Sequence, residues 1–272
     1  MTYSATVLAD SIGPHGVRIT TLEAVLPRLY LAELNTHRAF SRNSESSRAI
    51  PTEERIRRVM AEPYIPEFRE RVKGMGGGQP LTGAARTRAT GAWLNARDAA
   101  VEQAKKLLNV SKDDANRLLE PFSWHAVIIT ATEWENFFNL RVHEEAALPM
   151  QRVGRKLQEA IWLSTPKSLR YGDWHLPLVS DVEYDLMAGG VGNFGAKVSA
   201  GRCARSSYSN HMDPEVPNDS KDRWERLAAN GHWSPGEHPA KCVPPEPGDY
   251  GNFAPGWKQL RKHYLDEAIF RG

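Results

Sequence analysis

The sequence predicts an α/β or α+β domain with more helix than strand, and three observations support this fold class. Residues 3–9 and 17–25 are rich in apolar and β-branched residues and flank a Gly/Pro turn at 12–16, which is typical of a strand pair. Longer stretches with helical spacing of apolar residues follow, above all 84–108 and 133–163. The 272 residues show neither an internal repeat nor a clean linker, so we expect a single domain.

Local signals predict the other elements in chain order. From helix-start signals and apolar spacing, further helices are expected at 27–38, 52–62, 111–122, 221–229 and 257–269. Residues 123–130 fit a strand or a buried helical turn, and 182–187 fit a strand. The glycine-rich stretches 74–80 and 189–195 are expected to be a flexible loop and a turn. Pro149 should kink the longest helix, because proline has no amide proton to donate.

Composition and charge exclude several classes of protein. The net charge is only +2, so we expect no general binding of nucleic acid, and any anion must be bound by a local cluster. No apolar run approaches the ~18 residues of a membrane span. The first residues lack the pattern of a signal peptide, so a cytoplasmic location is the expectation. Two cysteines, Cys203 and Cys242, make no disulfide framework.

Residues 33–51 concentrate cations and hydroxyl groups in a short stretch. The segment ELNTHRAFSRNSESSRAIP contains His37, Arg38, Arg42 and Arg48 together with four serines. Phosphate binding needs arginine forks and hydroxyl donors, because a dianion must exchange its hydration for several charge-assisted hydrogen bonds. An anionic nucleotide is therefore one interpretation, and a capped, solvated loop is the other.

Arg141 lies on the same helical face as the aromatic residues Trp134 and Phe138. A cation that projects from an apolar stripe usually has an anionic partner, because an unpaired buried charge is costly. That partner is either a ligand or an internal carboxylate.

Other motifs do not point to a metal or to a common nucleotide-binding loop. Residues 231–238 (GHWSPGEH) hold two histidines, but their spacing to the cysteines matches no standard zinc pattern, and no metal is expected. The same stretch has one residue too many for a serine-hydrolase elbow. The glycine-rich loop 74–80 lacks the Lys-Ser/Thr of a P-loop.

Taken together, three separated segments resemble the flavin-dependent thymidylate synthases. That family's signature, Arg-His-Arg followed by Ser, Asn-Glu and Ser-x-Arg, is similar in spacing to residues 36–48. Residues 133–151 resemble the family's helix with an Asn-Phe-x-Asn-Leu-Arg core. Residues 203–208 (CARSSY) and 231–238 resemble two segments that usually precede the signature. Their late position resembles a circular permutation, of the kind associated with phage and actinobacterial relatives.

The resemblance implies a fold and a set of site residues. The fold would be a central mixed or antiparallel sheet flanked by helices, as one domain over 1–272 with a motif-bearing core at 17–165 and a flavin-binding segment at about 196–272. The residues implied for the nucleotide are Glu45, Ser46, Ser47, Arg48, Arg117 and Arg141, with Arg141 also catalytic. The residues implied for the flavin are His37, Arg38, Ala39, Asn43, Asn136, Leu140, Ser207, Ser234 and Glu237.

The resemblance also implies the activity, which is FAD-dependent C5 methylation of a uridine 5′-monophosphate, dUMP to dTMP. Methylenetetrahydrofolate would donate the carbon, NADPH would reduce the flavin, and the active sites would be shared within a homotetramer. The chain departs from the family pattern at Thr36, Ser44 and Glu145. UMP as substrate, or transfer of a hydroxymethyl group, would fit the same scaffold. The rival hypotheses are a non-catalytic nucleotide- or nucleic-acid-binding protein and a metal hydrolase built on His232 and His238.

Overall fold

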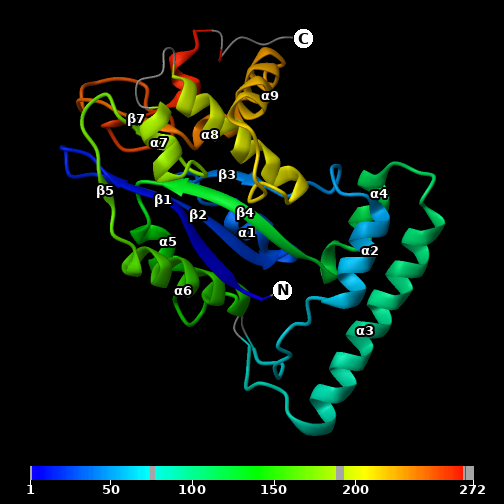
Figure 1. The fold of residues 1–272 in the computed structure, drawn as a ribbon. Helices are drawn as coiled ribbons and strands as arrows, with labels where there is room; N and C mark the ends of the chain where they lie inside the picture. The colour runs from blue at the N-terminus through cyan, green and yellow to red at the C-terminus, as the bar shows by residue number, and fades with distance from the viewer. Residues whose placement is uncertain (1, 74–76, 188–192, 266, 268–272) are drawn as a thin grey trace.

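A mixed five-stranded sheet forms the centre of the computed structural model, which describes residues 2–73, 77–187, 193–265 and 267 (Figure 1). Its strands, in the order β3-β4-β2-β1-β5, are β3 (Ser41–Ser44), β4 (Trp124–Ala131), β2 (Arg18–Pro27), β1 (Ser4–Ile12) and β5 (Lys167–Ser168). Neighbouring strands are antiparallel except for the parallel pair β1 and β5. The predicted α/β class, the sheet with flanking helices and the first strand pair are confirmed.

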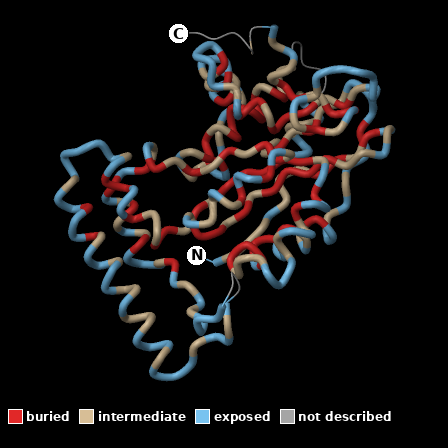
Figure 2. Tube along the Cα trace, turned by 180° about the vertical axis from the view of Figure 1, so that it is seen from behind, coloured by how far each residue is buried: buried red, intermediate tan, exposed pale blue. Residues whose placement is uncertain are grey.

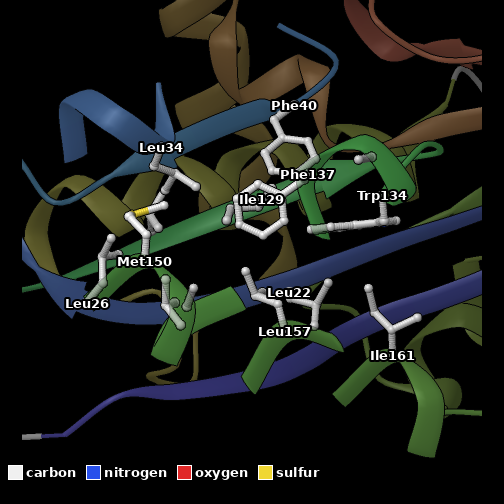
Figure 3. Packing of buried hydrophobic residues seen from close by; sticks show 14 residues of the cluster. Leu22, Leu26, Leu34, Phe40, Ile129, Trp134, Phe137, Met150, Leu157 and Ile161 are labelled. Atoms are coloured by element: carbon white, nitrogen blue, oxygen red, sulfur yellow. The ribbon is translucent and has the colours of Figure 1, made fainter. Parts of the chain in front are cut away.

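One face of the sheet carries the main hydrophobic core. Side chains alternate along β2, so that Leu22, Ala24 and Leu26 are fully buried on this face, and Ile129 of β4 packs beside them (Figure 3). Helices α5 (Glu135–Arg141) and α6 (Leu148–Leu163) cover this face. The buried aromatic and aliphatic side chains of these helices complete the cluster, which therefore fixes where Arg141 lies.

The prediction of one long helix kinked at Pro149 is wrong. The helix ends at Arg141, and a second one begins at Leu148 with Pro149 in its first turn. Proline is well suited to that position, because the amide groups of the first turn have no partner within the helix. Pro149 therefore starts α6.

The opposite side of the sheet is covered by the C-terminal part of the chain (Figure 1). It contains α7 (Asp181–Met187), α8 (Phe194–Ala204), η3 (Arg205–Tyr208), α9 (Pro217–Ala229) and η4 (Ser234–Glu237). A small antiparallel sheet, ordered β6-β7-β8, consists of β6 (Trp174–His175), β7 (Ala240–Cys242) and β8 (Trp257–Gln259). The short turn η5 (Leu260–His263) follows it.

A third group of helices forms an arm beside the sheet, with α2 (Thr52–Ala61), α3 (Gly83–Lys106), α4 (Lys112–Arg117) and the turn η2 (Glu120–Phe122). Val59, Val101 and Leu119 are buried in its own small core. Most of α3 is exposed (Figure 2). The predicted helices at 52–62 and 84–108 are confirmed, and 123–130 is resolved as the strand β4.

Three further predictions of secondary structure are wrong or incomplete. The segment expected as a strand at 182–187 is the helix α7. Ser180, just before it, donates from its N–H and hydroxyl to the Glu183 carboxylate, and its hydroxyl accepts from the Glu183 N–H. The expected helix at 257–269 begins as strand β8, because its backbone pairs with β7. The helix expected at 27–38 consists of η1 (Arg28–Tyr30) and α1 (Leu31–Leu34).

The expected glycine-rich loop and turn lie partly outside the described residues, as does the end of the last expected helix. Among the residues that the structure describes, no helix has the length and apolarity needed to cross a membrane.

Candidate functional site

A cavity of about 880 Å³ lies where three distant segments of the chain meet. It is formed by the loop after β3, the junction of α8 with η3, one face of α9, and the start of η4. The lining residues are Asn43, Ser46, Arg48, Ala49, Ala204, Ser207, Tyr208, Arg223, Arg226, Leu227, Asn230, His232, Ser234 and Pro235. The cavity thus joins residues of the 36–48 segment to residues of 203–208 and 231–238.

The strand β3 positions the first of these segments. It pairs with β4 so that Asn43 lies opposite Ile128, and strand alternation buries both Ser41 and Asn43. The hydroxyl of Ser41 accepts a hydrogen bond of 2.9 Å from the side-chain amide of Gln259. After the strand, the backbone N–H of Ser46 donates to the carbonyl of Ser207 at 3.0 Å. That bond directly joins the signature loop to η3.

Asn43 lines the cavity and has one buried polar atom without a partner in the part of the chain that the structure describes. The residue is only 8% exposed, and its side-chain oxygen Oδ1 has no hydrogen-bond partner among the described residues. Buried polar atoms are nearly always hydrogen-bonded, because leaving one without a partner costs its full desolvation. An N–H or O–H donor of a ligand would satisfy this atom.

Arg141 is held by three neighbours at the other end of the signature segment. Its Nε donates to Nε2 of His37 at 3.0 Å, and its two NH groups donate to the Thr36 hydroxyl at 3.1 Å and to Glu33 at 3.3 Å. The internal carboxylate considered in the sequence analysis is therefore present, as Glu33. Arg141 remains 20% exposed at its side chain, so part of the guanidinium still faces solvent.

His37 is neutral at physiological pH. Burial, together with the nearby positive charges of Arg141 and Arg42, lowers its pKa to about 4. Since Nε2 accepts the hydrogen bond from Arg141, the proton of the neutral ring is on Nδ1. Neutral His37 can therefore orient Arg141 without repelling it.

Two residues implied for the nucleotide point toward the helical arm instead of the cavity. The carboxylate of Glu45 is buried and forms ion pairs with Arg55 and Arg58. The hydroxyl of Ser47 donates to Glu120 at 2.6 Å. Both side chains therefore tie the signature loop to the elements that follow it.

The structure places the remaining expected residues apart from the cavity lining. Arg117, 59% exposed, pairs with Asp113 at 3.3 Å. Glu237 pairs with Arg261 at 2.9 Å, and burial raises the pKa of its carboxyl. Arg38, Asn136 and Leu140 are exposed, and Ala39 is half-buried. Of the expected residues, the cavity brings together Asn43, Ser46, Arg48, Ser207 and Ser234.

Most of the cavity wall formed by α9 was not predicted from the sequence. Arg223, Arg226, Leu227 and Asn230 have the i, i+3, i+4, i+7 spacing of one helical face, and all four line the cavity. That spacing is visible in the sequence, between two segments that resemble ligand-binding motifs. The sequence does not show which face of α9 packs against the rest of the protein and which faces the cavity.

The structure gives no support to the metal-hydrolase hypothesis within its described ranges. No group of three or more His, Cys, Asp or Glu side chains there is arranged to hold a metal ion. His238 is instead buried, where its Nδ1 lies 2.8 Å from the Thr130 hydroxyl. Cys242 lies 3.6 Å from His15, and burial raises the pKa of its thiol to about 11.

The class of site that these features define is a nucleotide-sized polar cavity lined by arginines and hydroxyl groups. Solved structures similar to the chain include the UMP/dUMP methylase PolB from Streptomyces cacaoi bound with 5-Br UMP, at 17% identity and a TM-score of 0.49, over 59% of this chain and 88% of that one. The same methylase bound with 5-Br dUMP matches at 21% identity and a TM-score of 0.42, over 53% and 66%.

A third similar structure is the flavin-dependent thymidylate synthase ThyX from Helicobacter pylori, complexed with FAD and dUMP. It matches at 22% identity and a TM-score of 0.37, over 53% of this chain and 67% of that chain. No family model and no curated protein matches the chain. A functional assignment therefore has to come from the residues of this chain itself.

Proposed function

We propose that the protein is a flavin-dependent methyltransferase that transfers a one-carbon unit from methylenetetrahydrofolate to C5 of dUMP. One observation carries the proposal. The cavity collects Asn43, Ser46 and Arg48 of the signature segment together with Ser207 and Ser234 of the two displaced segments. The resemblance assigned Asn43, Ser207 and Ser234 to the flavin and Ser46 and Arg48 to the nucleotide, from motifs far apart in the chain.

The cavity fits a phosphorylated flavin. Its volume of about 880 Å³ is within the size range of ligand pockets, and its wall offers arginine forks and hydroxyl groups. The unsatisfied Oδ1 of Asn43 can accept a hydrogen bond from a ring N–H or a ribityl hydroxyl. When bound, the flavin supplies the hydride that reduces the transferred carbon, after its own reduction by NADPH.

Arg141 is the proposed catalytic residue. C5 of uracil becomes nucleophilic when negative charge builds up on the ring carbonyls, and a preorganised guanidinium stabilises that charge. His37, Glu33 and Thr36 hold Arg141 in a defined orientation before substrate binds. The other proposed nucleotide ligands are Ser46, Arg48 and Arg117, and the other proposed flavin ligands are His37, Arg38, Ala39, Asn136, Leu140 and Glu237.

Arg141 does not line the cavity of its own chain. From the resemblance we propose a homotetramer in the cytoplasm, in which residues of one copy, Arg141 among them, complete the site of another. The chain would be a single, circularly permuted domain over 1–272, and its late segments would take the place that the family's early segments have.

One assay tests the proposal directly. Purified protein is offered dUMP and UMP separately, with methylenetetrahydrofolate, FAD and NADPH, and the product masses are measured. We expect flavin absorbance that bleaches with NADPH, and a methyl increment on dUMP. A methyl increment on UMP, or a hydroxymethyl increment, would assign the alternative substrate or reaction. A colourless protein that binds nucleotide without turning it over would support a non-catalytic role.

A further inference from the structure

Helix α9 has two distinct faces. Ser220, Trp224 and Ala228 recur every four residues, are buried and pack against α8. The adjacent face, with Arg223, Arg226, Leu227 and Asn230, lines the cavity. The packing of the first face therefore fixes which side chains the second face presents to a ligand.

The two arginines of the cavity face differ in their partners. Arg223 donates from both NH groups to the carboxylate of Glu215, and this pairing lowers the pKa of Glu215 to about 2. Arg226 forms no ion pair with any carboxylate in the described part of the chain. Arg223 is thus neutralised by a neighbouring acid, while Arg226 keeps its donors and its charge for another partner.

Arg48 lines the same cavity from the loop after β3, and it too has no carboxylate partner among the described residues. Two exposed arginines from distant segments therefore line one solvent-open cavity without a carboxylate partner in the ranges that the structure describes. No aspartate or glutamate is among the residues that line it. Such an arrangement favours an anion that can accept several hydrogen bonds at once, as a phosphate does.

We infer that Arg226 is a phosphate-binding residue of this cavity and acts together with Arg48. The ligand group is a phosphate ester or pyrophosphate of a nucleotide. The inference deepens the proposed function and rests on it only for which nucleotide is bound, FAD or dUMP. The resemblance to the flavin-dependent thymidylate synthases assigns no role to Arg226, because α9 lies between the two matching segments.

The test compares Arg226→Gln with wild type in binding four separate probes: FAD, riboflavin, dUMP and inorganic pyrophosphate. Losing a charge-assisted hydrogen bond should weaken phosphate binding about tenfold or more. If the phosphate belongs to the flavin, FAD binding weakens and riboflavin binding is unchanged. If it belongs to the substrate, dUMP binding weakens instead. Pyrophosphate binding should weaken in either case.

Two further variants control the measurement. Arg155→Gln removes an exposed arginine of α6, which lies outside the cavity, and should change none of the four affinities. Arg226→Lys keeps the charge and should recover part of the affinity. Equal affinities of Arg226→Gln and wild type for all phosphate-bearing probes would overturn the inference and leave the proposed function intact. A wild type that binds pyrophosphate but neither FAD nor dUMP would overturn the function alone, and one that binds none of the four would overturn both.

Discussion

The guanidinium of Arg141 donates in three directions, to His37, Thr36 and Glu33. Only an arginine can make these contacts together, because its planar fork has five donors in a fixed geometry. The signature that residues 36–48 resemble has an arginine at this position, whereas the Thr36 hydroxyl accepts a hydrogen bond from Arg141. The departure therefore removes a cation and adds a contact that orients the proposed catalytic residue.

Replacing Arg141 by Lys keeps the charge but loses this geometry. We expect turnover of dUMP to fall by about 10²- to 10³-fold, as for the loss of other preorganised donors. Flavin content should be retained, because the Lys variant keeps a positive charge beside His37. Steady-state kinetics and the visible absorbance of the purified variant measure both effects.

The conservative change Glu33→Gln is the matched control. It retains the guanidinium and removes one ion pair, so its loss of turnover should be much smaller. Undiminished turnover by the Lys variant would show that the guanidinium geometry of Arg141 is not needed for catalysis.

Close packing of α8 against α9 decides the position of the cavity wall. Gly201 of α8 meets α9 at Ser220, and a Cβ at Gly201 would overlap the Ser220 carbonyl oxygen. A Cβ at Gly236 would likewise overlap the ring of Trp224. Two glycines thus allow α9 to approach both α8 and η4, so that the arginine face of α9 lines the cavity.

The change Gly201→Ala should push the two helices apart. We expect it to lower the free energy of unfolding by about 1–3 kcal/mol, the usual cost of overpacking, and to weaken FAD binding. Urea denaturation and flavin titration measure the two effects.

The matched control is Gly91→Ala in α3, where an added Cβ meets nothing within 4 Å. That change should be stabilising by about 0.5–1 kcal/mol, as expected for Ala over Gly in a helix. If both variants behaved alike, the helix contact would not limit the wall.

The stability of the whole molecule depends in part on two buried neutral histidines, His175 and His238. The rings of His175 and His238 belong to one hydrogen-bonded network with Ser11, Thr21 and Thr130. This network lies on the face of the sheet that the C-terminal part of the chain covers. Burial lowers the pKa of both histidines to about 3. The network links the central sheet to β6 and η4, so protonation of either ring would affect the contact between the two halves of the protein.

Acid should therefore destabilise the protein well above the range in which carboxylates titrate. In the unfolded chain these histidines bind protons below about pH 6.5, whereas the folded state resists protonation to about pH 3. Stability is complete above pH 6.5 and falls as the pH drops toward 3, by at most ~1.4 kcal/mol per pH unit for each histidine. Urea denaturation at pH 7.5 and pH 5 measures the loss.

Two variants separate this effect from general acid sensitivity. His238→Asn should make the dependence on pH shallower, because one of the buried rings is gone. His143→Gln, at an exposed position, should leave the dependence unchanged. An unchanged slope in His238→Asn would contradict the assignment of the loss to the buried network.

Local patterning was enough to predict much of the fold. The strand pair β1 and β2 and the helices α2, α3 and α9 follow from period-2 or helical spacing between clear turn signals. Where the prediction failed, a partner far away in the chain was decisive. Residues 257–259 form a strand because β7 lies beside them, and Ser41–Ser44, with no apolar pattern, form β3 because β4 pairs with them.

The same division holds for the site. The sequence by itself determined which polar segments are candidates for a ligand-binding region, because the spacing of charged and hydroxyl residues can be compared with a known signature without any knowledge of packing. Only the tertiary structure decided that Asn43, Arg48 and Ser207 share a cavity, that Glu45 and Ser47 point away from it, and that Arg226 joins it. The physical reason is that a side chain's direction depends on what buries the other face of its element, and for β3 and α9 those partners are distant in the chain.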